Sequence, residues 1–209
     1  MKSWVVSGLK KGILTTRFPA GDAEDVPLWT TKPVRISAGD VNCPTGAIST
    51  DTVDMNRCIS CGRCSEHFAP DGSPGHSEVL STIPIARRSM HVYMIDTGSC
   101  GACNAEVHAL QNPVYDFNRL GMFFTNTPRH ADALVIVGVV SEGMEEALKA
   151  AYDAMPSPKT VIAAGACALS GGIIGAGASG TIRADVLVPG CPPSPHALLD
   201  ALNRARDAR

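Results

Sequence analysis

Eight cysteines are the residues through which this 209-residue chain could perform chemistry. The N-terminal segment has too short an apolar stretch for a secretory signal and carries no twin-arginine pair, so we expect a cytoplasmic protein. Because thiols are kept reduced in the cytoplasm, eight cysteines indicate metal ligands rather than disulfides. Thiolates are soft ligands that suit zinc and iron–sulfur clusters, and the spacing of the cysteines distinguishes these two kinds of site.

The first four cysteines show the spacing of a ferredoxin-like cluster site. Cys58, Cys61 and Cys64 are each separated by two residues, which allows one loop to turn three thiolates inward. A ferredoxin run would continue with Cys-Pro where this chain has Phe68, but an isolated Cys-Pro pair begins upstream at Cys43. In two-cluster ferredoxins the fourth cysteine of one run binds the cluster of the other run. The segment therefore resembles a two-cluster ferredoxin that has kept one [4Fe–4S] cluster, with Cys43 as its fourth ligand.

The other four cysteines come from three separate loops, each directly after a strand-like apolar run. They are Cys100, Cys103, Cys167 and Cys191. Parallel strands end at one edge of a sheet, so thiols that are distant in sequence can meet there. Four soft ligands meeting in a cytoplasmic protein predict a second [4Fe–4S] cluster. A zinc-stabilised binding module without a redox role is the alternative, although zinc sites commonly use looser, paired spacing.

The elements that must position these cysteines change along the chain. Residues 1–36 form an N-terminal arm with a short amphipathic start, which packs on its own domain or docks on a partner or membrane surface. Residues 37–85 are interpreted as a small α+β ferredoxin-like domain. From residue 86 to residue 209 strand-like and helix-like runs alternate, which favours an α/β domain with a flavodoxin-like parallel sheet.

The expected elements of the α/β domain follow from apolar runs and helix signals. Unbroken aliphatic runs suit parallel strands that are covered on both faces. The strand-like runs are residues 91–95, 133–140, 160–164 and 185–188, and the helix-like runs are residues 104–111, 142–155 and 195–206. The charge of the chain is nearly balanced, with 18 basic and 20 acidic residues, so nothing indicates nucleic-acid binding. No apolar run approaches the length that spans a bilayer.

Four motifs in order resemble the 20 kDa subunit family of NADH:quinone oxidoreductase over about residues 88–202. They are Cys-x2-Cys-x2-Glu from Cys100 to Glu106, Thr-Pro-Arg-His-Ala-Asp from Thr127, Gly-Ala-Cys ending at Cys167, and Gly-Cys-Pro-Pro from Gly190. The family often has serine at the position of Thr127, and threonine keeps the hydroxyl group. The family includes the small subunits of membrane-bound [NiFe] hydrogenases such as formate hydrogenlyase.

This resemblance implies an electron-transfer subunit of a membrane-associated [NiFe]-hydrogenase-like oxidoreductase, without a complete active site of its own. The implied partners are a catalytic large subunit (hydrogenase-like or 49 kDa-like), a ferredoxin or other electron-carrier subunit, and membrane subunits. The implied location is peripheral, on the cytoplasmic face of the inner membrane. Because residues 4–19 are also similar to the N-terminus of the separate ferredoxin subunit in related complexes, we interpret the chain as a fusion of the two.

Two features of the first family motif indicate which branch of the family the chain resembles and which residue handles protons. Quinone-reducing members carry two adjacent cysteines, whereas the hydrogenase branch carries Cys-x2-Cys, as this chain does at Cys100 and Cys103. A quinone-reducing or sulfur-reducing respiratory complex is the alternative assignment. The resemblance also implies that Glu106 handles protons near a subunit interface. A first-turn acid favoured by the helix dipole would explain the same residue equally well.

Overall fold

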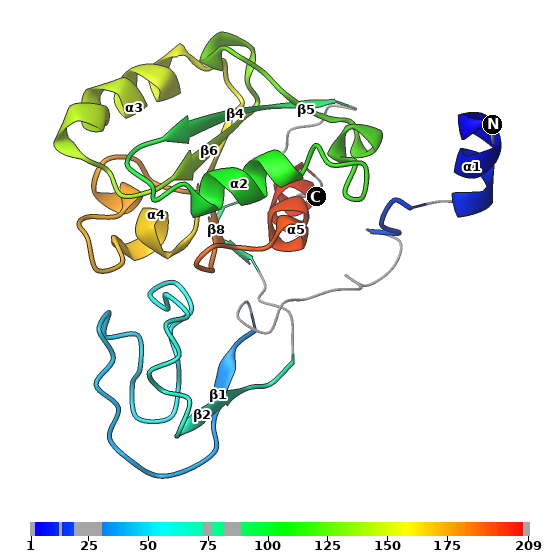
Figure 1. Cartoon of the computed structure of the whole chain (residues 1–209). Helices are drawn as coiled ribbons and strands as arrows, with labels where there is room; N and C mark the ends of the chain where they lie inside the picture. Colours follow the sequence, from blue (N-terminus) through cyan, green and yellow to red (C-terminus); the bar gives the residue numbers. More distant parts are fainter. Residues whose placement is uncertain (1–2, 13, 19–30, 73–76, 82–88, 207–209) are drawn as a thin grey trace.

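The computed structural model describes residues 3–12, 14–18, 31–72, 77–81 and 89–206. A small, loop-rich domain and a larger α/β domain are the two main bodies (Figure 1). Most of the predicted linker between them, residues 86–90, falls outside the described residues, so the domain limits at residues 36 and 85 stay predictions.

A six-stranded sheet organises the α/β domain, in the order β3-β8-β7-β6-β4-β5. The strands are β3 (Glu78–Val79), β4 (Met90–Asp96), β5 (Met122–Phe124), β6 (Ala133–Val137), β7 (Thr160–Ala164) and β8 (Val186–Val188). Strands β4 to β8 run parallel, and β3 pairs antiparallel with β8. Counted in chain order, the parallel strands lie 2-1-3-4-5, which is the flavodoxin-like order. The predicted flavodoxin-like fold of the α/β domain is therefore confirmed.

The two faces of the sheet bury alternate residues of the same strands. In β6, Val135 packs in the cluster formed with helices α2 and α5, whereas Leu134 and Ile136 pack in the cluster formed with α3 and α4. All five residues of β6 and all five of β7 are buried, as expected for strands covered on both sides. This alternation gives three layers, in which helices lie on both faces of the sheet (Figure 1).

The helices follow the strands in the order that the sequence predicts. They are α2 (Ala102–Ala109), α3 (Glu142–Ala154), α4 (Ala166–Ser170) and α5 (Pro195–Arg206), with short 3-10 turns η2 (Phe117–Leu120), η3 (Pro128–His130) and η4 (Ala178–Gly180). Helix α5 has the predicted limits, and α3 ends one residue before the predicted end. The sequence missed β3 and β5 because two or three residues are too few to show a period, and it missed the five-residue helix α4.

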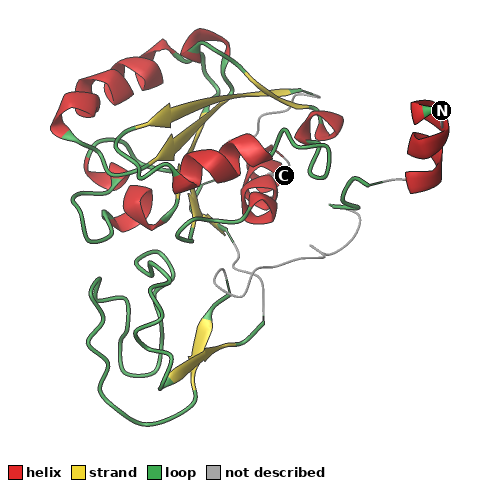
Figure 2. Cartoon of the chain, viewed as in Figure 1, coloured by secondary structure: helices red, strands yellow, loops and turns green. Residues whose placement is uncertain are grey.

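The small domain is mostly loop around one short antiparallel pair (Figure 2). Strand β1 (Pro33–Arg35) pairs with β2 (Phe68–Pro70). The core of the small domain consists of Ala47, Val53 and Phe68. Three further apolar side chains and three of the cysteines pack against them: Val41, Ile48, Met55, Cys43, Cys58 and Cys64. The guanidinium carbon of Arg35 lies 5.0 Å from the centre of the Phe68 ring. With so small an apolar core, the domain has little to hold it together apart from its cysteine loops.

The N-terminal arm divides into an exposed helix and a docked segment. Helix α1 (Trp4–Lys11) has no buried residue and lies apart from the sheet in Figure 1. Residues 14–18 instead contact the α/β domain. The backbone N–H of Thr16 donates to the carbonyl of Val114 at 2.7 Å, and Arg119 donates to the carbonyls of Thr16 and Phe18. This part of the arm therefore packs on its own chain.

No helix within the described ranges is both long enough and apolar enough to cross a bilayer.

Candidate metal centres

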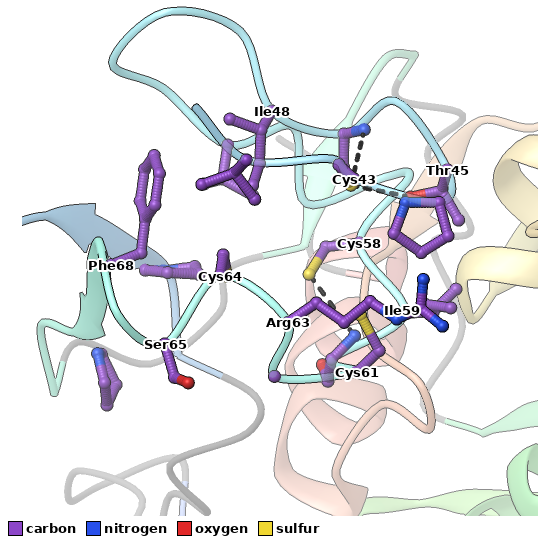
Figure 3. A pocket seen from close by; sticks show the side chains of 18 of the residues that line it. Cys43, Thr45, Ile48, Cys58, Ile59, Cys61, Arg63, Cys64, Ser65 and Phe68 are labelled. Atoms are coloured by element: carbon purple, nitrogen blue, oxygen red, sulfur yellow. Dashed lines mark hydrogen bonds between the residues drawn. The ribbon is translucent and has the colours of Figure 1, made fainter. Parts of the chain in front are cut away.

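A cavity of about 270 Å³ in the small domain is lined by all four cysteines of the first set (Figure 3). Cys58, Cys61 and Cys64 come from one loop, and Cys43 comes from the preceding loop. Apolar side chains supply much of the remaining lining, among them Ile48 on one wall. Phe68 occupies the position where a ferredoxin run would have its own fourth cysteine. Its side chain is only 3% exposed and forms part of the cavity wall.

Backbone N–H groups in these loops point at sulfur. The N–H of Ala47 donates to Sγ of Cys43 at 3.3 Å, and the N–H of Ser60 donates to Sγ of Cys58 at 3.4 Å. Burial on its own would raise the pKa of Cys43. Hydrogen bonds from Thr45, Ala47 and Ile48 outweigh it and lower that pKa. N–H donors stabilise the thiolate, which is the form that binds metal.

The four thiols of the first set lie close enough to repel one another when charged. Burial raises the pKa of Cys58, and the negative charges of Cys64, Cys43 and Cys61 raise it further. Burial also raises the pKa of Cys64, with contributions from Cys61 and Cys43. Without a cation nearby, Cys58 and Cys64 therefore favour the protonated form, and a metal centre would displace their protons.

The second set gathers beyond the C-terminal ends of three parallel strands. Cys100 lies in the loop after β4 and Cys103 in the first turn of α2. Cys167 lies in α4 after β7, and Cys191 lies in the loop between β8 and α5. The flavodoxin-like order explains this convergence, because the carboxyl ends of parallel strands form the ligand-binding edge of such a sheet.

Glycine at position 165 allows two of these loops to approach closely. A Cβ atom on Gly165 would lie 2.6 Å from Sγ of Cys103, which is closer than real Cβ contacts allow, and its φ of +91° also favours glycine. The next residue, Ala166, donates its N–H to the carbonyl of Gly190 at 2.8 Å. The loops that carry Cys167 and Cys191 are thus tied together beside Cys103.

The pKa values of the second set identify the same grouping. Burial raises the pKa of Cys103 to about 12, and the charges of Cys191, Cys167 and Cys100 contribute in that order, followed by Asp96. Burial and the charge of Cys100 raise the pKa of Cys167. These charge interactions link the four thiols of the second set, and the four thiols of the first set line one cavity. Their role as ligands of a metal centre stays a prediction.

Asp96, which the sequence analysis did not single out, organises the Cys100–Cys103 loop. Its carboxylate accepts hydrogen bonds from the N–H groups of Gly98 and Ser99, from the Ser99 hydroxyl and from the Asn104 amide, at 2.7–2.9 Å. Burial alone would raise the pKa of Asp96, but these hydrogen bonds lower it. The sequence Asp-Thr-Gly-Ser from Asp96, at the end of a strand, is a turn signal. The role of Asp96 in holding this turn could have been predicted from it.

Glu106 lies in the second turn of α2, whose first turn holds no acidic residue, so the alternative of a first-turn acid is wrong. Its side chain is half-buried. Burial raises the pKa of its carboxyl group. A raised pKa makes a carboxyl group a candidate for proton exchange. Its role in proton handling stays a prediction.

All eight cysteines are free thiols, so none is in a disulfide. Among the described residues, no three side chains of His, Cys, Asp and Glu are grouped so that they could hold a metal ion. The donor chemistry nevertheless fits two iron–sulfur clusters: each set has four thiols, and the first set also has N–H donors directed at sulfur.

The α/β domain thus combines a flavodoxin-like sheet with four free thiols that follow the ends of its parallel strands. The family model for the 20 kDa subunit of NADH ubiquinone oxidoreductase matches residues 100–205, which is half of the chain. The chain belongs to this family of oxidoreductase subunits. Residues 1–99, which include the small domain, lie outside the match.

Curated relatives come from both branches of the family. An uncharacterized protein of Methanocaldococcus jannaschii is 40% identical over 121 residues, covering 56% of this chain and 82% of the relative. Formate hydrogenlyase subunit 7 of Escherichia coli is 39% identical, covering 54% of this chain but only 47% of the relative. An NADH-quinone oxidoreductase subunit of Geotalea daltonii is 40% identical, covering 53% of this chain and 68% of the relative. Overall identity therefore does not separate the branches.

Proposed function

We propose that this chain is an electron-transfer subunit of a membrane-associated [NiFe]-hydrogenase-like oxidoreductase, with two [4Fe–4S] clusters. The observation that supports the proposal is the placement of the eight free thiols: four line one cavity of the small domain, and four follow the ends of parallel strands in the α/β domain. When bound, the clusters would supply one-electron carriers to or from a catalytic large subunit. Membership of an oxidoreductase subunit family favours this function over a zinc-stabilised binding module.

The residues of the chain would bind the clusters and control their surroundings. Cys43, Cys58, Cys61 and Cys64 would hold the first cluster, and Cys100, Cys103, Cys167 and Cys191 the second. The N–H groups of Ala47 and Ser60 would donate to the ligand sulfurs, and such donors tune a cluster's potential. The ring of Phe68 would exclude water from one side of the first cluster.

Glu106 and the small domain complete the proposal. Glu106 would take up or release protons at the interface with the large subunit. The small domain, fused to the family domain, would take the place of a separate ferredoxin-like subunit. The remaining partners would be an electron carrier and membrane subunits, with the complex on the cytoplasmic face of the membrane.

The spacing of Cys100 and Cys103 supports the hydrogenase branch, since quinone-reducing members carry adjacent cysteines there. The second candidate is a subunit of a quinone-reducing or sulfur-reducing complex, which the 40% identity to the NADH-quinone oxidoreductase subunit of Geotalea daltonii favours. The large subunit that purifies with this chain would distinguish the two. Paired Cys-x2-Cys motifs and bound nickel in that large subunit would support the hydrogenase assignment. A large subunit with neither the motifs nor nickel would refute it.

The cluster content can be tested by anaerobic purification followed by iron and acid-labile sulfide analysis. We expect about eight irons and eight sulfides per chain for two cubanes. A colourless protein that contains zinc would contradict the redox function altogether. About four irons would limit the function to a single cluster.

A further inference from the structure

The loop of the first cysteine set meets the second set at one glycine. Gly172 lies just beyond the C-terminal end of α4, the helix that carries Cys167. A Cβ atom on Gly172 would lie 3.5 Å from Sγ of Cys167 and 3.8 Å from Cγ2 of Ile59. Ile59 is the residue after Cys58, so a single position contacts a ligand of one set and the ligand loop of the other.

We propose that the contact between Ile59 and Gly172 fixes the separation of the two cysteine sets and makes the Cys58 side of the first set face Cys167. This inference rests on the proposed two-cluster function. One electron passing across the contact would oxidise one cluster and reduce the other by one electron, with no bond made or broken. Because such transfer slows steeply with distance, the packing at Gly172 would control its rate.

Other contacts support this orientation of the small domain. The side-chain amide of Asn56, two residues before Cys58, donates to the carboxylate of Glu78 in β3 at 3.4 Å. Strand β3 pairs with β8, whose end leads to Cys191. In Figure 3 Ile59 lies across the pocket from Phe68, on the side away from the small domain's sheet.

The conformation of Gly172 makes a matched substitution possible. Its φ is +58°, a left-handed conformation that asparagine tolerates better than other side chains. Gly72 has a similar φ of +77°, but a Cβ there would meet no described atom within 4 Å. Gly172→Asn would therefore insert a side chain into the contact, and Gly72→Asn would impose the same backbone requirement without touching it.

The experiment is electron paramagnetic resonance of the full chain after complete reduction with dithionite, with iron measured on each sample. We expect the wild type to show the broadened, split spectrum of two interacting clusters. Gly172→Asn should retain about eight irons and show a changed splitting, whereas Gly72→Asn should keep the wild-type splitting. A wild type with eight irons but no splitting, or a Gly172→Asn spectrum identical to that of the wild type, would overturn the inference.

A second variant tests the contact without relying on the clusters. Ile59→Ala should increase hydrogen exchange both around residues 58–64 and around residues 166–174, because each segment protects the other. If Gly172→Asn loses iron, the spectrum and exchange of Ile59→Ala decide the question. Unchanged exchange in the second segment would refute the contact. A wild type with fewer than eight irons would count against the proposed function, while the exchange result would still decide the contact.

Discussion

Asp96 places a fixed negative charge beside the second cysteine set. Its four hydrogen bonds hold the turn that carries Cys100, and its charge reaches Cys103. Negative charge near a cluster disfavours the reduced, more negative state. We expect Asp96→Asn to raise the midpoint potential of the second cluster by roughly tens of millivolts in a redox titration. A potential that stays the same or falls would contradict this role.

The same substitution should change the dependence of stability on pH. The pKa of Asp96 is lowered from its usual value of 3.8 in the folded chain. Its carboxylate therefore stabilises the fold above pH 3.8, and this contribution is lost as the pH falls through the folded-state pKa. In thermal unfolding, Asp96→Asn should lower the midpoint at neutral pH, and its difference from the wild type should shrink at acid pH.

Glu106 offers a separate test of proton handling. We expect Glu106→Gln to reduce the hydrogen-dependent activity of the assembled complex about 10²-fold, because loss of a positioned acid–base group typically costs that much. Reduction of the clusters by dithionite should be unchanged. Glu142→Gln, which removes an acid from α3 on the other face of the sheet, is the control for loss of a helix carboxylate. Equal, small effects of the two substitutions would assign Glu106 to helix stability alone.

At the scale of elements, Phe68 links strand β2 to the first cysteine set. Its side chain is the largest in the core of the small domain and packs near Cys43, Cys58 and Cys64. Phe68→Ala should destabilise this domain by about 3–5 kcal/mol and lower the iron content toward that of one cluster. Val34→Ala is the control, since Val34 lies on the adjacent strand β1 and is 41% exposed. Full iron content in the Phe68 variant would contradict this structural role.

The sequence predicted the parts of the fold that rest on long, regular patterns. Strands β6 and β7 were found because their apolar runs are uninterrupted, and α5 because its apolar stripe begins after Gly-Cys-Pro-Pro. Strand β3 was missed because it has only two residues, and these adopt a strand conformation by pairing with β8 rather than through a pattern in their own sequence. The small domain could be inferred from cysteine spacing alone, since its chain is mostly loop and shows no apolar period.

The grouping of the cysteines was predictable, but the contact between the groups was not. Parallel strand ends meet by rule, so Cys100, Cys167 and Cys191 could be brought together from sequence. The closeness of Ile59 to Gly172 depends on how the small domain packs against α4, which no local pattern encodes. The role of Asp96 was partly predictable. The turn that it forms is signalled by the local sequence, but its effect on the pKa of Cys103 depends on the folded structure.

At the scale of the whole molecule, the family match covers residues 100–205 of the α/β domain and leaves residues 1–99 to be explained. Residues 14–18 dock on the α/β domain, and the loop of the first cysteine set touches the segment that follows α4. The approach of Ile59 to Gly172 and the hydrogen bond from Asn56 to Glu78 place the small domain at the edge where the second set lies. This position suits the proposed electron relay, which requires that both cysteine sets bind clusters.

The most direct test of that claim compares the iron content and the spectra of two serine variants, Cys61→Ser and Cys167→Ser. Each removes one ligand from one set, so each should disturb one cluster and leave the spectrum of the other intact. We predict about eight irons in the wild type and a loss of about half in each variant, with complementary spectra. Full iron in the Cys167→Ser chain, or loss of the same signal in both variants, would contradict the assignment of two independent cluster sites.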